Sequence, residues 1–236
     1  MATKKLTAGQ LKEKDFDEIS RTFINRVYRW MTLALLISGF TALYTASSQT
    51  LISFIFGSKF VFYGLLIAEL ALVFILSATL HKMSVGLGIF FFLLYSVING
   101  LTLSSIFIVF EIRSISIVFF ISAAMFAGMS IYGAKTKQNL MSAGRYLMMA
   151  LIGLVIASVV NLLLKSSVLE WIISLVSVGI FTGLTAYDTQ KMFRIARNSD
   201  DSEIFKKVSV MGALELYLDF INIFLSLLNL FGKRRS

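Results

Sequence analysis

Seven long apolar runs divide this sequence and leave it very few ways to fold. They cover residues 27–47, 60–80, 85–110, 115–134, 146–164, 168–189 and 208–231. Each run has close to the roughly 20 apolar residues that a helix needs to cross the hydrocarbon core of a bilayer. Hydrophobic residues make up 57% of the chain and charged residues only 15%, which is far more apolar than an ordinary soluble domain. We therefore predict an all-α membrane protein, a seven-transmembrane-helix bundle.

The segments outside the runs complete this organisation. Residues 1–26 are predicted to form a cytoplasmic N-terminal tail with helical tendency, residues 27–232 the seven-helix domain, and residues 233–236 a basic C-terminal tail. The first apolar run is too long for the core of a cleavable signal peptide, so we expect it to remain as a membrane helix. The chain has no cysteine, which excludes disulfides and thiolate metal sites, and no proline.

The basic residues predict how the chain is oriented. Lys and Arg number 16 on the side of the first 26 residues and 6 on the other side. Cytoplasmic segments of membrane proteins carry this excess, so we expect a cytoplasmic N-terminus. Seven complete spans would place the C-terminus outside, whereas a re-entrant last helix would return its basic tail to the cytoplasm. The net charge of +9 is thereby explained by membrane orientation, and we expect no nucleic-acid partner.

Four acidic residues lie inside the apolar runs: Glu69, Asp188, Glu215 and Asp219. An ionisable group at membrane depth is costly and is by default a candidate functional site. All Lys and Arg residues fall in predicted loops, tails or span ends, so no base is expected within a span. The four acids should then be protonated, exposed to water or neutralised by a bound cation.

The last apolar run carries its polar residues on one helical face. Glu215, Asp219, Asn222, Ser226 and Asn229 follow one another at steps of four and three residues. Weaker polar faces occur in the sixth run, at Ser174, Ser177, Thr185 and Asp188, and in the third run, at Asn99 and Thr102. Together they predict an oxygen-lined interior. The alternative is that these side chains only join helices by hydrogen bonds, an interpretation that is weaker for the carboxylates.

Carboxylate, amide and hydroxyl oxygens favour hard cations such as Ca²⁺, Mg²⁺ or Na⁺. The lone histidine, His81, stands at the end of the second run, which argues against a transition-metal site. Neighbouring carboxylates share protons, so such a site would also respond to pH. The spacing leaves the contact between Asp188 and Asp219 open. If the last helix enters the membrane near Val208, Asp219 lies about 16 Å deeper, and Glu215 is the nearer partner of Asp188.

Three short segments resemble the signatures of a known family. Residues 216–224, LYLDFINIF, are similar to the C-terminal signature of the Bax inhibitor-1 family, also called the transmembrane Bax inhibitor motif family. Residues 186–190, AYDTQ, resemble its second signature, and Gly133-Ala134-Lys135 together with Glu69 fits bacterial members. The resemblance extends from about Arg21 to the end of the chain, and it favours a bacterial plasma (inner) membrane as the location.

The resemblance implies a fold with the C-terminal helix at the centre and a pH-sensitive Ca²⁺ leak as the function. It makes Asp188 and Asp219 the pH-sensing pair and the Ca²⁺ ligands. We place Glu69, Glu215 and Asn222 beside them as accessory groups.

In bacterial relatives a basic residue near the end of the second helix can act as a latch on the aspartate of the sixth helix. Leu80 aligns with that position here, and His81 and Lys82, which follow it, are the possible latch residues.

Other functions stay open at this point. The protein could be a non-conducting regulator that binds membrane proteins such as a membrane protease, or a cation-coupled transporter. An intramembrane aspartyl protease matches at Ala186-Tyr187-Asp188, but the glycines expected before its second aspartate are missing before Asp219. We therefore expect no enzyme and no cofactor, with the lipid bilayer, Ca²⁺ and protons as partners.

Overall fold

The computed structural model describes residues 8–198, 200 and 202–235, although the side chains of residues 8–17 and of His81 are outside the described part. These residues are mainly helical, and the single β-bridge among them joins Phe110 to Arg234. In chain order the helices are α1 (Ala8–Ser47), α2 (Gln49–Gly57), α3 (Lys59–Thr79), η1 (Leu80–Lys82), α4 (Val85–Leu103), α5 (Ile106–Val109), α6 (Ile112–Lys135), α7 (Met141–Leu164), α8 (Ser167–Ala196) and α9 (Glu203–Phe231).

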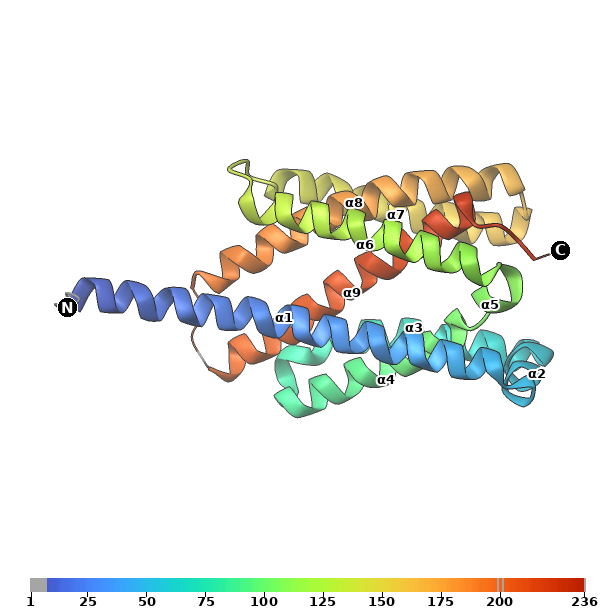
Figure 1. Ribbon diagram of the computed structural model, residues 1–236, viewed down its shortest axis with the longest axis horizontal. Helices are drawn as coiled ribbons and strands as arrows, with labels where there is room; N and C mark the ends of the chain where they lie inside the picture. The colour runs from blue at the N-terminus through green and yellow to red at the C-terminus, as the bar shows by residue number, and fades with distance from the viewer. Residues whose placement is uncertain (1–7, 199, 201, 236) are drawn as a thin grey trace.

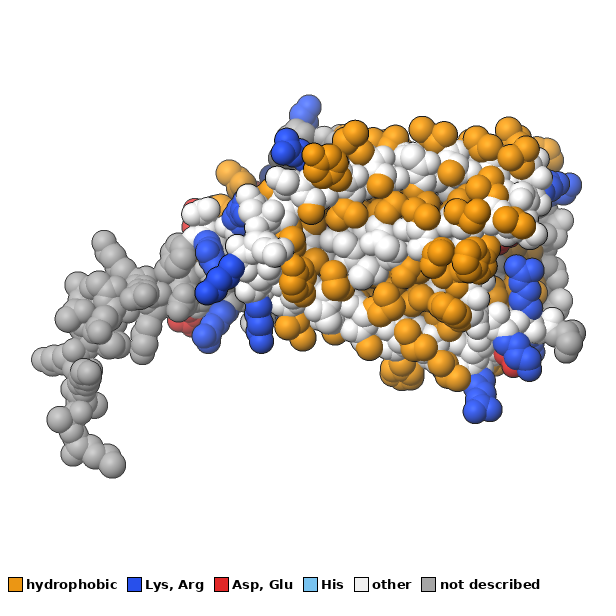
Figure 2. Space-filling model, turned by 90° about the horizontal axis from the view of Figure 1, so that it is seen from above, with side chains coloured by type: hydrophobic (Ala, Val, Ile, Leu, Met, Phe, Trp, Pro, Cys, Tyr) orange, Lys and Arg blue, Asp and Glu red, His pale blue; other side chains and the backbone are white. Residues whose placement is uncertain are grey.

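Seven of these segments are long and apolar enough to cross a membrane, which confirms the predicted seven-helix bundle. α4 and α5 count as one of the seven, Val85–Val109, and each of the other six is a single helix. Figure 2 shows apolar side chains spread along the bundle, with Lys and Arg gathered at its two ends. The short α2, which connects α1 to α3, was not predicted.

α9 forms the centre of the bundle. It packs against α1, α4, α6 and α8, while α3 packs on α4 and α7 packs on α8 at the outside (Figure 1). In its most apolar stretch 67% of the residues of α9 are buried, compared with none in α7. A helix that touches neighbours on every side must carry any polar group against another helix, so the acids of α9 are held within the protein.

α9 crosses the whole bundle, and the start of α1 and the end of α9 lie at opposite ends of the molecule (Figure 1). Its 29 residues span about 43 Å, more than the roughly 30 Å of a hydrocarbon core. The helix is thus long enough for a complete span, which the re-entrant alternative does not require. The C-terminal residues then turn back onto the start of α6, where Glu111 N donates to Lys233 O at 2.9 Å and Arg235 N donates to Val109 O at 2.9 Å.

α8 and α9 extend beyond the apolar runs that predicted them. α8 continues to Ala196 and α9 begins at Glu203, so the loop between them covers only residues 197–202. The apolar runs stop at residue 189 and resume at residue 208, which predicts a longer loop over residues 190–207. That prediction was wrong, because hydropathy marks the part of a helix that contacts lipid and not the residue at which the helix ends. The extra turns let the two helices pair over their polar ends.

Serine side chains set several of the helix boundaries. Ser84 and Ser166 cap α4 and α8 by accepting from Leu87 N and Leu169 N. Between α4 and α5, Ser104 and Ser105 turn their hydroxyls back to the carbonyls of Leu101 and Thr102 at 2.6 and 2.8 Å. Such bonds compete with the helical backbone pattern, and the helix is interrupted there.

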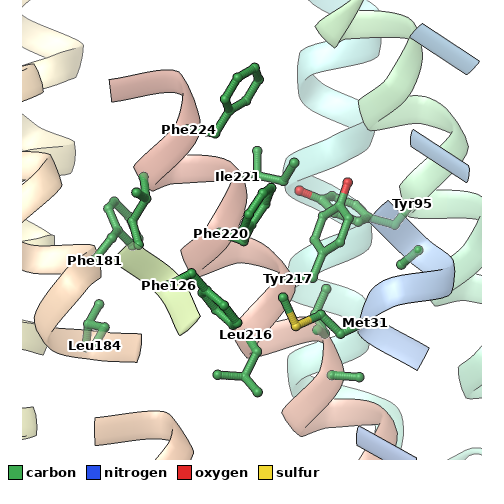
Figure 3. Packing of buried hydrophobic residues seen from close by; sticks show 14 of the residues in the cluster. Met31, Tyr95, Phe126, Phe181, Leu184, Leu216, Tyr217, Phe220, Ile221 and Phe224 are labelled. Atoms are coloured by element: carbon green, nitrogen blue, oxygen red, sulfur yellow. The ribbon is translucent and has the colours of Figure 1, made fainter. Parts of the chain in front are cut away.

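An aromatic core fixes the position of α9. Figure 3 shows the rings of Phe220, Phe126, Tyr217 and Tyr95 packed around this helix. Phe126 meets Phe220 edge to face at 5.8 Å between ring centroids, and Tyr95 meets Tyr217 in the same manner at 5.8 Å. Edge-to-face pairs of this kind add to the stability gained by burial, so α9 is held in one rotation about its axis.

Candidate functional site

Polar side chains gather in two places along α9. The first, which we call the acidic cluster, comprises Asp188 and Lys191 from α8 with Glu215 and Asp219 from α9. The second, which we call the tyrosine cluster, is formed by Tyr217 from α9, Ser38 from α1, Glu69 from α3, and Asn99 and Thr102 from α4. Because Tyr217 lies between Glu215 and Asp219 in the chain, opposite faces of the same part of α9 serve two separate polar sites.

Lys191 is the cation of the acidic cluster. Its Nζ lies 2.8 Å from Oε1 and 2.9 Å from Oε2 of Glu215, so it donates to both oxygens. The same Nζ lies 3.9 Å from Oδ1 of Asp188, one turn earlier on α8. The side chains of Lys191 and Glu215 are partly exposed, at 32% and 21%, whereas that of Asp188 is 11% exposed.

Asp219 is the most buried acid of the cluster, with 3% of its surface exposed. Thr185, Asp188 and Glu215 neighbour its carboxyl group, and the hydroxyl of Thr185 donates to Phe181 O of its own helix at 2.8 Å. Its Oδ2 is buried and has no hydrogen-bond partner in the described part of the protein. A buried carboxylate oxygen left without a partner is unfavourable, so this atom is available to a proton or a cation.

The expectation that no base lies within a span was wrong. Lys191 was assigned to a loop because the apolar run ends at Thr189, but α8 continues past it and points the ammonium at the acids of α9. The acidic cluster nevertheless keeps an excess of negative groups, since three carboxyl groups share this one ammonium. Protons or a further cation can supply the remaining positive charge.

Small residues bring α6 and α7 close to the signature at the end of α8. A Cβ on Gly133 of α6 would collide with the carbonyl of Ala186, and a Cβ on Gly144 of α7 would collide with the ring of Tyr187. Each glycine therefore allows an approach that no larger residue permits. Two of the three segments that carry the family resemblance, at residues 133–135 and 186–190, are thus in direct contact.

Gln190 fastens the loop between α6 and α7 to the same end of α8. Its Nε2 donates to Gln138 O at 2.8 Å, and its Oε1 accepts from Leu140 N at 2.8 Å. These bonds satisfy backbone groups of a loop that has few other partners. Together with the two glycine contacts, they hold the turn of α8 that carries Asp188.

Tyr217 is the centre of the tyrosine cluster. Its hydroxyl donates to Asn99 Oδ1 at 2.8 Å and lies 2.7 Å from Ser38 Oγ, and the residue is fully buried. Glu69 approaches the same place from α3, with Asn99 and Thr102 as hydrogen-bonding neighbours, but its Oε1 is buried without a partner among the described residues. The cluster therefore contains a second carboxyl group whose hydrogen bonding is incomplete.

The predicted polar face of α8 is buried, whereas that of α9 is buried only in part. All four residues of the α8 face are buried: Ser174, Ser177, Thr185 and Asp188. On α9, Ser226 is buried, Asn222 donates its Nδ2 to Leu218 O of its own helix at 2.8 Å, and Asn229 is exposed. The polar line on α9 therefore faces the interior from Glu215 to Ser226 and leaves it at the last turn.

The described residues at the end of α3 and in η1 form no ion pair with these acids. Leu80 is buried in η1, Lys82 is exposed, and the side chain of His81 lies outside the described residues. In the part of the chain that the structure covers, the ammonium that pairs with Asp188 belongs to Lys191.

The oxygen atoms of the acidic cluster suit a loosely held cation more than a permanent metal centre. Among the described residues, no group of three or more His, Cys, Asp and Glu side chains is arranged to hold a metal ion. The available donors are the carboxylates of Asp188 and Asp219 and the side chain of Thr185, all hard oxygen ligands. Oxygen donors of this kind are the ones that hard cations prefer.

Lys191, Tyr217 and Ser38 take part in these clusters although sequence reasoning did not select them. A signal existed for Lys191, which stands three residues after Asp188 and would share its face on a continued helix. Tyr217 stands inside the α9 signature, and the hydroxyl of a buried tyrosine needs a partner. Ser38 had no such signal, because only the packing of α1 on α9 brings it to Tyr217.

Together these features define an integral membrane protein whose central, C-terminal helix carries a buried carboxyl group against its preceding neighbour. The chain belongs to the Bax inhibitor-1 family: the family described as "Inhibitor of apoptosis-promoting Bax1" matches residues 20–236.

Bacterial relatives match nearly their whole length. Inner membrane protein YbhL of Escherichia coli strain K12 is 48% identical over 217 residues, covering 91% of this chain and 93% of the relative. An uncharacterised protein of Borreliella burgdorferi is 42% identical over 226 residues, covering 95% and 97%. Protein RP147 of Rickettsia prowazekii, also uncharacterised, is 39% identical over 236 residues, covering 99% and 98%.

Proposed function

We propose that this protein is a pH-sensitive Ca²⁺ leak, with Asp188 and Asp219 as the groups that bind the ion and the proton. The observation that carries this proposal is the charge balance of the acidic cluster, in which three carboxyl groups share one ammonium. Asp219 is buried, and among the described residues its Oδ2 has no hydrogen-bond partner. A divalent cation, or protons on two of the acids, restores the balance.

Each residue of the cluster then has a chemical role. Asp188 and Asp219 supply carboxylate oxygens to the passing ion, and Glu215 holds Lys191 as the resident counter-ion. Protons compete with Ca²⁺ for the same oxygens, because a protonated carboxyl group no longer attracts a cation. The leak therefore depends on pH through the occupancy of the acids.

Glu69 and Asn222 serve the same passage as accessory groups. Glu69 lies near the middle of α3 with Asn99 and Thr102 beside it, on the α4 side of α9. Its incompletely bonded carboxyl group offers oxygen at a second point along the central helix.

Ca²⁺ entry into proteoliposomes that enclose a fluorescent indicator tests the proposal. We expect downhill entry that changes with pH and is lost, or made independent of pH, in Asp188→Asn and Asp219→Asn. Glu170→Gln is the matched control, because this residue is an exposed acid at the other end of α8. Flux unchanged in both aspartate variants, with the pH response intact, would remove the role assigned to these residues.

The same vesicles separate the remaining functions. A coupled transporter would need a second solute or an imposed proton gradient for Ca²⁺ entry, whereas a leak runs without either. Vesicles that stay closed to Ca²⁺ at every pH, with protein correctly inserted, would favour a non-conducting regulator. We assign no enzymatic step to the acids, since the proposed role requires only binding and release.

A further inference from the structure

An apolar groove of about 360 Å³ opens between α1 and α6, over the part of α9 that lies beneath them (Figure 1). Leu35, Gly39 and Leu43 line it from α1, and Phe120 from α6 lies at its side with 71% of its surface exposed. Phe224 of α9 belongs to the same lining. Because these helices are membrane spans, the groove is open to lipid and not to water.

The groove presents no free hydrogen-bonding side chain to an occupant. Among its described lining residues, Ser38 and Ser116 are the polar ones. Ser116 Oγ donates to Ile112 O at 3.1 Å, and Ser38 Oγ is engaged with Ser96 O and the hydroxyl of Tyr217 at 2.7 Å each. The body of any ligand held here must therefore be hydrocarbon.

One end of the groove carries a group of cations. Arg235 Nη1 donates to the carbonyl of Phe107, a lining residue, at 3.0 Å. Lys233 N donates to Ser114 Oγ at 2.9 Å, next to the lining residue Ile112 and to Arg113. Together with Arg234, the group has four basic side chains, all exposed.

The group is short of acids. Glu111 is the acid that the structure pairs with it, at 2.8 Å from Lys233 Nζ. The three arginines, Arg113, Arg234 and Arg235, therefore give this end of the groove an excess of positive charge.

The position of this group is unusual for a membrane protein. It lies at the end of the bundle with the fewer basic residues, 6 compared with 16, and four of those six belong to it. Membrane proteins concentrate Lys and Arg on the cytoplasmic side, so their orientation does not explain four basic residues at the opposite end. The β-bridge of Phe110 with Arg234 holds the tail beside the groove, where Arg235 contacts the lining residue Phe107.

From these observations we infer that the groove is a binding site for an anionic phospholipid. One acyl chain lies between α1 and α6, and the phosphate is held by the arginines at the end of the groove. Arginine is suited to this role because its planar donors match phosphate oxygens. The inference concerns a face of α9 different from the acidic cluster, and it does not depend on Ca²⁺ conduction.

Native mass spectrometry of the full chain tests it, using equal amounts of phosphatidylglycerol and phosphatidylcholine with identical acyl chains. We expect phosphatidylglycerol to be retained preferentially. Arg235→Gln should lower that preference about fivefold, the contribution typical of one basic residue at an anionic lipid surface. Lys59→Gln is the matched control, because Lys59 is an exposed base at the same end of the bundle but outside the groove.

Gly39→Leu tests the groove itself. Gly39 lines the groove and a Cβ there meets no atom within 4 Å, so a leucine side chain can enter the groove and should reduce retention of both lipids. Gly153→Leu on the lipid-facing α7, also free of close neighbours, should leave retention unchanged. Equal retention of the two lipids by the unmodified protein would overturn the inference. An unaltered amount of bound lipid in Gly39→Leu would also overturn it. A changed oligomeric state in that variant would do the same, because it would mark the groove as a contact between copies of the protein.

Discussion

The ammonium of Lys191 lies between the two carboxylate oxygens of Glu215, at 2.8 and 2.9 Å, and joins α8 to α9 at the acidic cluster. Asp188 shares the same cation at 3.9 Å. Under the proposed function, this tethered charge lies where a free cation would meet these oxygens. The pair therefore has two effects that can be measured separately, one on the stability of the helix pair and one on ion binding.

Replacing Lys191 by methionine removes the charge and keeps most of the side-chain volume. The free energy of unfolding should fall by about 1 to 3 kcal/mol, because Glu215 loses two charge-assisted hydrogen bonds in a partly buried place. Under the proposed function, Ca²⁺ entry should rise, since the resident competitor is gone. Unfolding in mixed micelles and flux into vesicles measure the two effects, with Lys137→Met in an exposed loop as the control.

A double-mutant cycle with Glu215→Gln shows whether the effect on stability belongs to the pair. The loss in Lys191→Met should become much smaller when Glu215 is already neutral. Equal losses in the two backgrounds would show that Lys191 acts through other contacts, and a flux that falls in Lys191→Met would contradict its role as a competitor.

Asp219→Asn should leave the protein at least as stable as before at neutral pH, in contrast to Lys191→Met. The buried carboxyl group has an oxygen without a partner, and its charge repels Asp188 and Glu215. An amide of the same shape removes that repulsion. The advantage of the variant should grow as pH rises, because the original carboxyl group then carries more charge, and it should vanish in acid. Unfolding measured over a pH series checks both statements, and a strongly destabilised variant at neutral pH would refute them.

The seven spans were predictable because hydrophobicity over twenty residues is decided by the bilayer and not by packing. The same signal misplaced Lys191, since the run ends at Thr189 whereas α8 continues to Ala196. Hydropathy reports contact with lipid, and the ends of α8 and α9 contact each other instead. A polar helix end that pairs with a second helix resembles a loop in sequence.

The two clusters illustrate a second limit. Glu69, Asn99 and Thr102 were each recognised as polar residues in apolar runs, but nothing in their spacing shows that α3 and α4 bring them together. Ser38 and Tyr217 stand 179 residues apart and meet only because α1 packs on α9. Periodicity gives the face of one helix, and the identity of the facing helix comes from the assembled bundle.

Gly133→Ala should separate α6 from α8. The added methyl group would coincide with the carbonyl of Ala186, a backbone atom that cannot move aside without shifting the helix. Overpacking of this kind costs about 1 to 3 kcal/mol, which should appear as a lower free energy of unfolding. Gly128→Ala on the same helix meets nothing within 4 Å and should be neutral, or more stable by up to about 1 kcal/mol through helix propensity.

The position of Asp188 should change with that contact, since Ala186 precedes it by two residues. A cysteine pair introduced across α8 and α9 near the acidic cluster would crosslink less efficiently in Gly133→Ala than in Gly128→Ala. Equal crosslinking and equal stability in the two glycine variants would mean that α6 adjusts without cost, and that the glycine does not position the acid.

Tyr217→Phe tests the tyrosine cluster by removing a single oxygen. The hydroxyl donates to Asn99 Oδ1 at 2.8 Å and bonds Ser38 Oγ at 2.7 Å, so its loss leaves buried polar atoms on two other helices without that partner. The ring remains and keeps its edge-to-face contact with Tyr95. The free energy of unfolding should therefore fall by about 1 to 3 kcal/mol through unsatisfied hydrogen bonding alone.

Tyr146→Phe supplies the comparison, because Tyr146 is 73% exposed on α7 and its hydroxyl contributes nothing to the centre of the bundle. This variant should match the original protein in unfolding. A second variant, Asn99→Leu combined with Tyr217→Phe, removes both partners of the bond and should recover part of the lost stability, since a buried apolar pair leaves fewer groups unsatisfied. If Tyr217→Phe proves as stable as Tyr146→Phe, the hydroxyl is not what holds α9 against α1 and α4, and the aromatic packing around it must be sufficient.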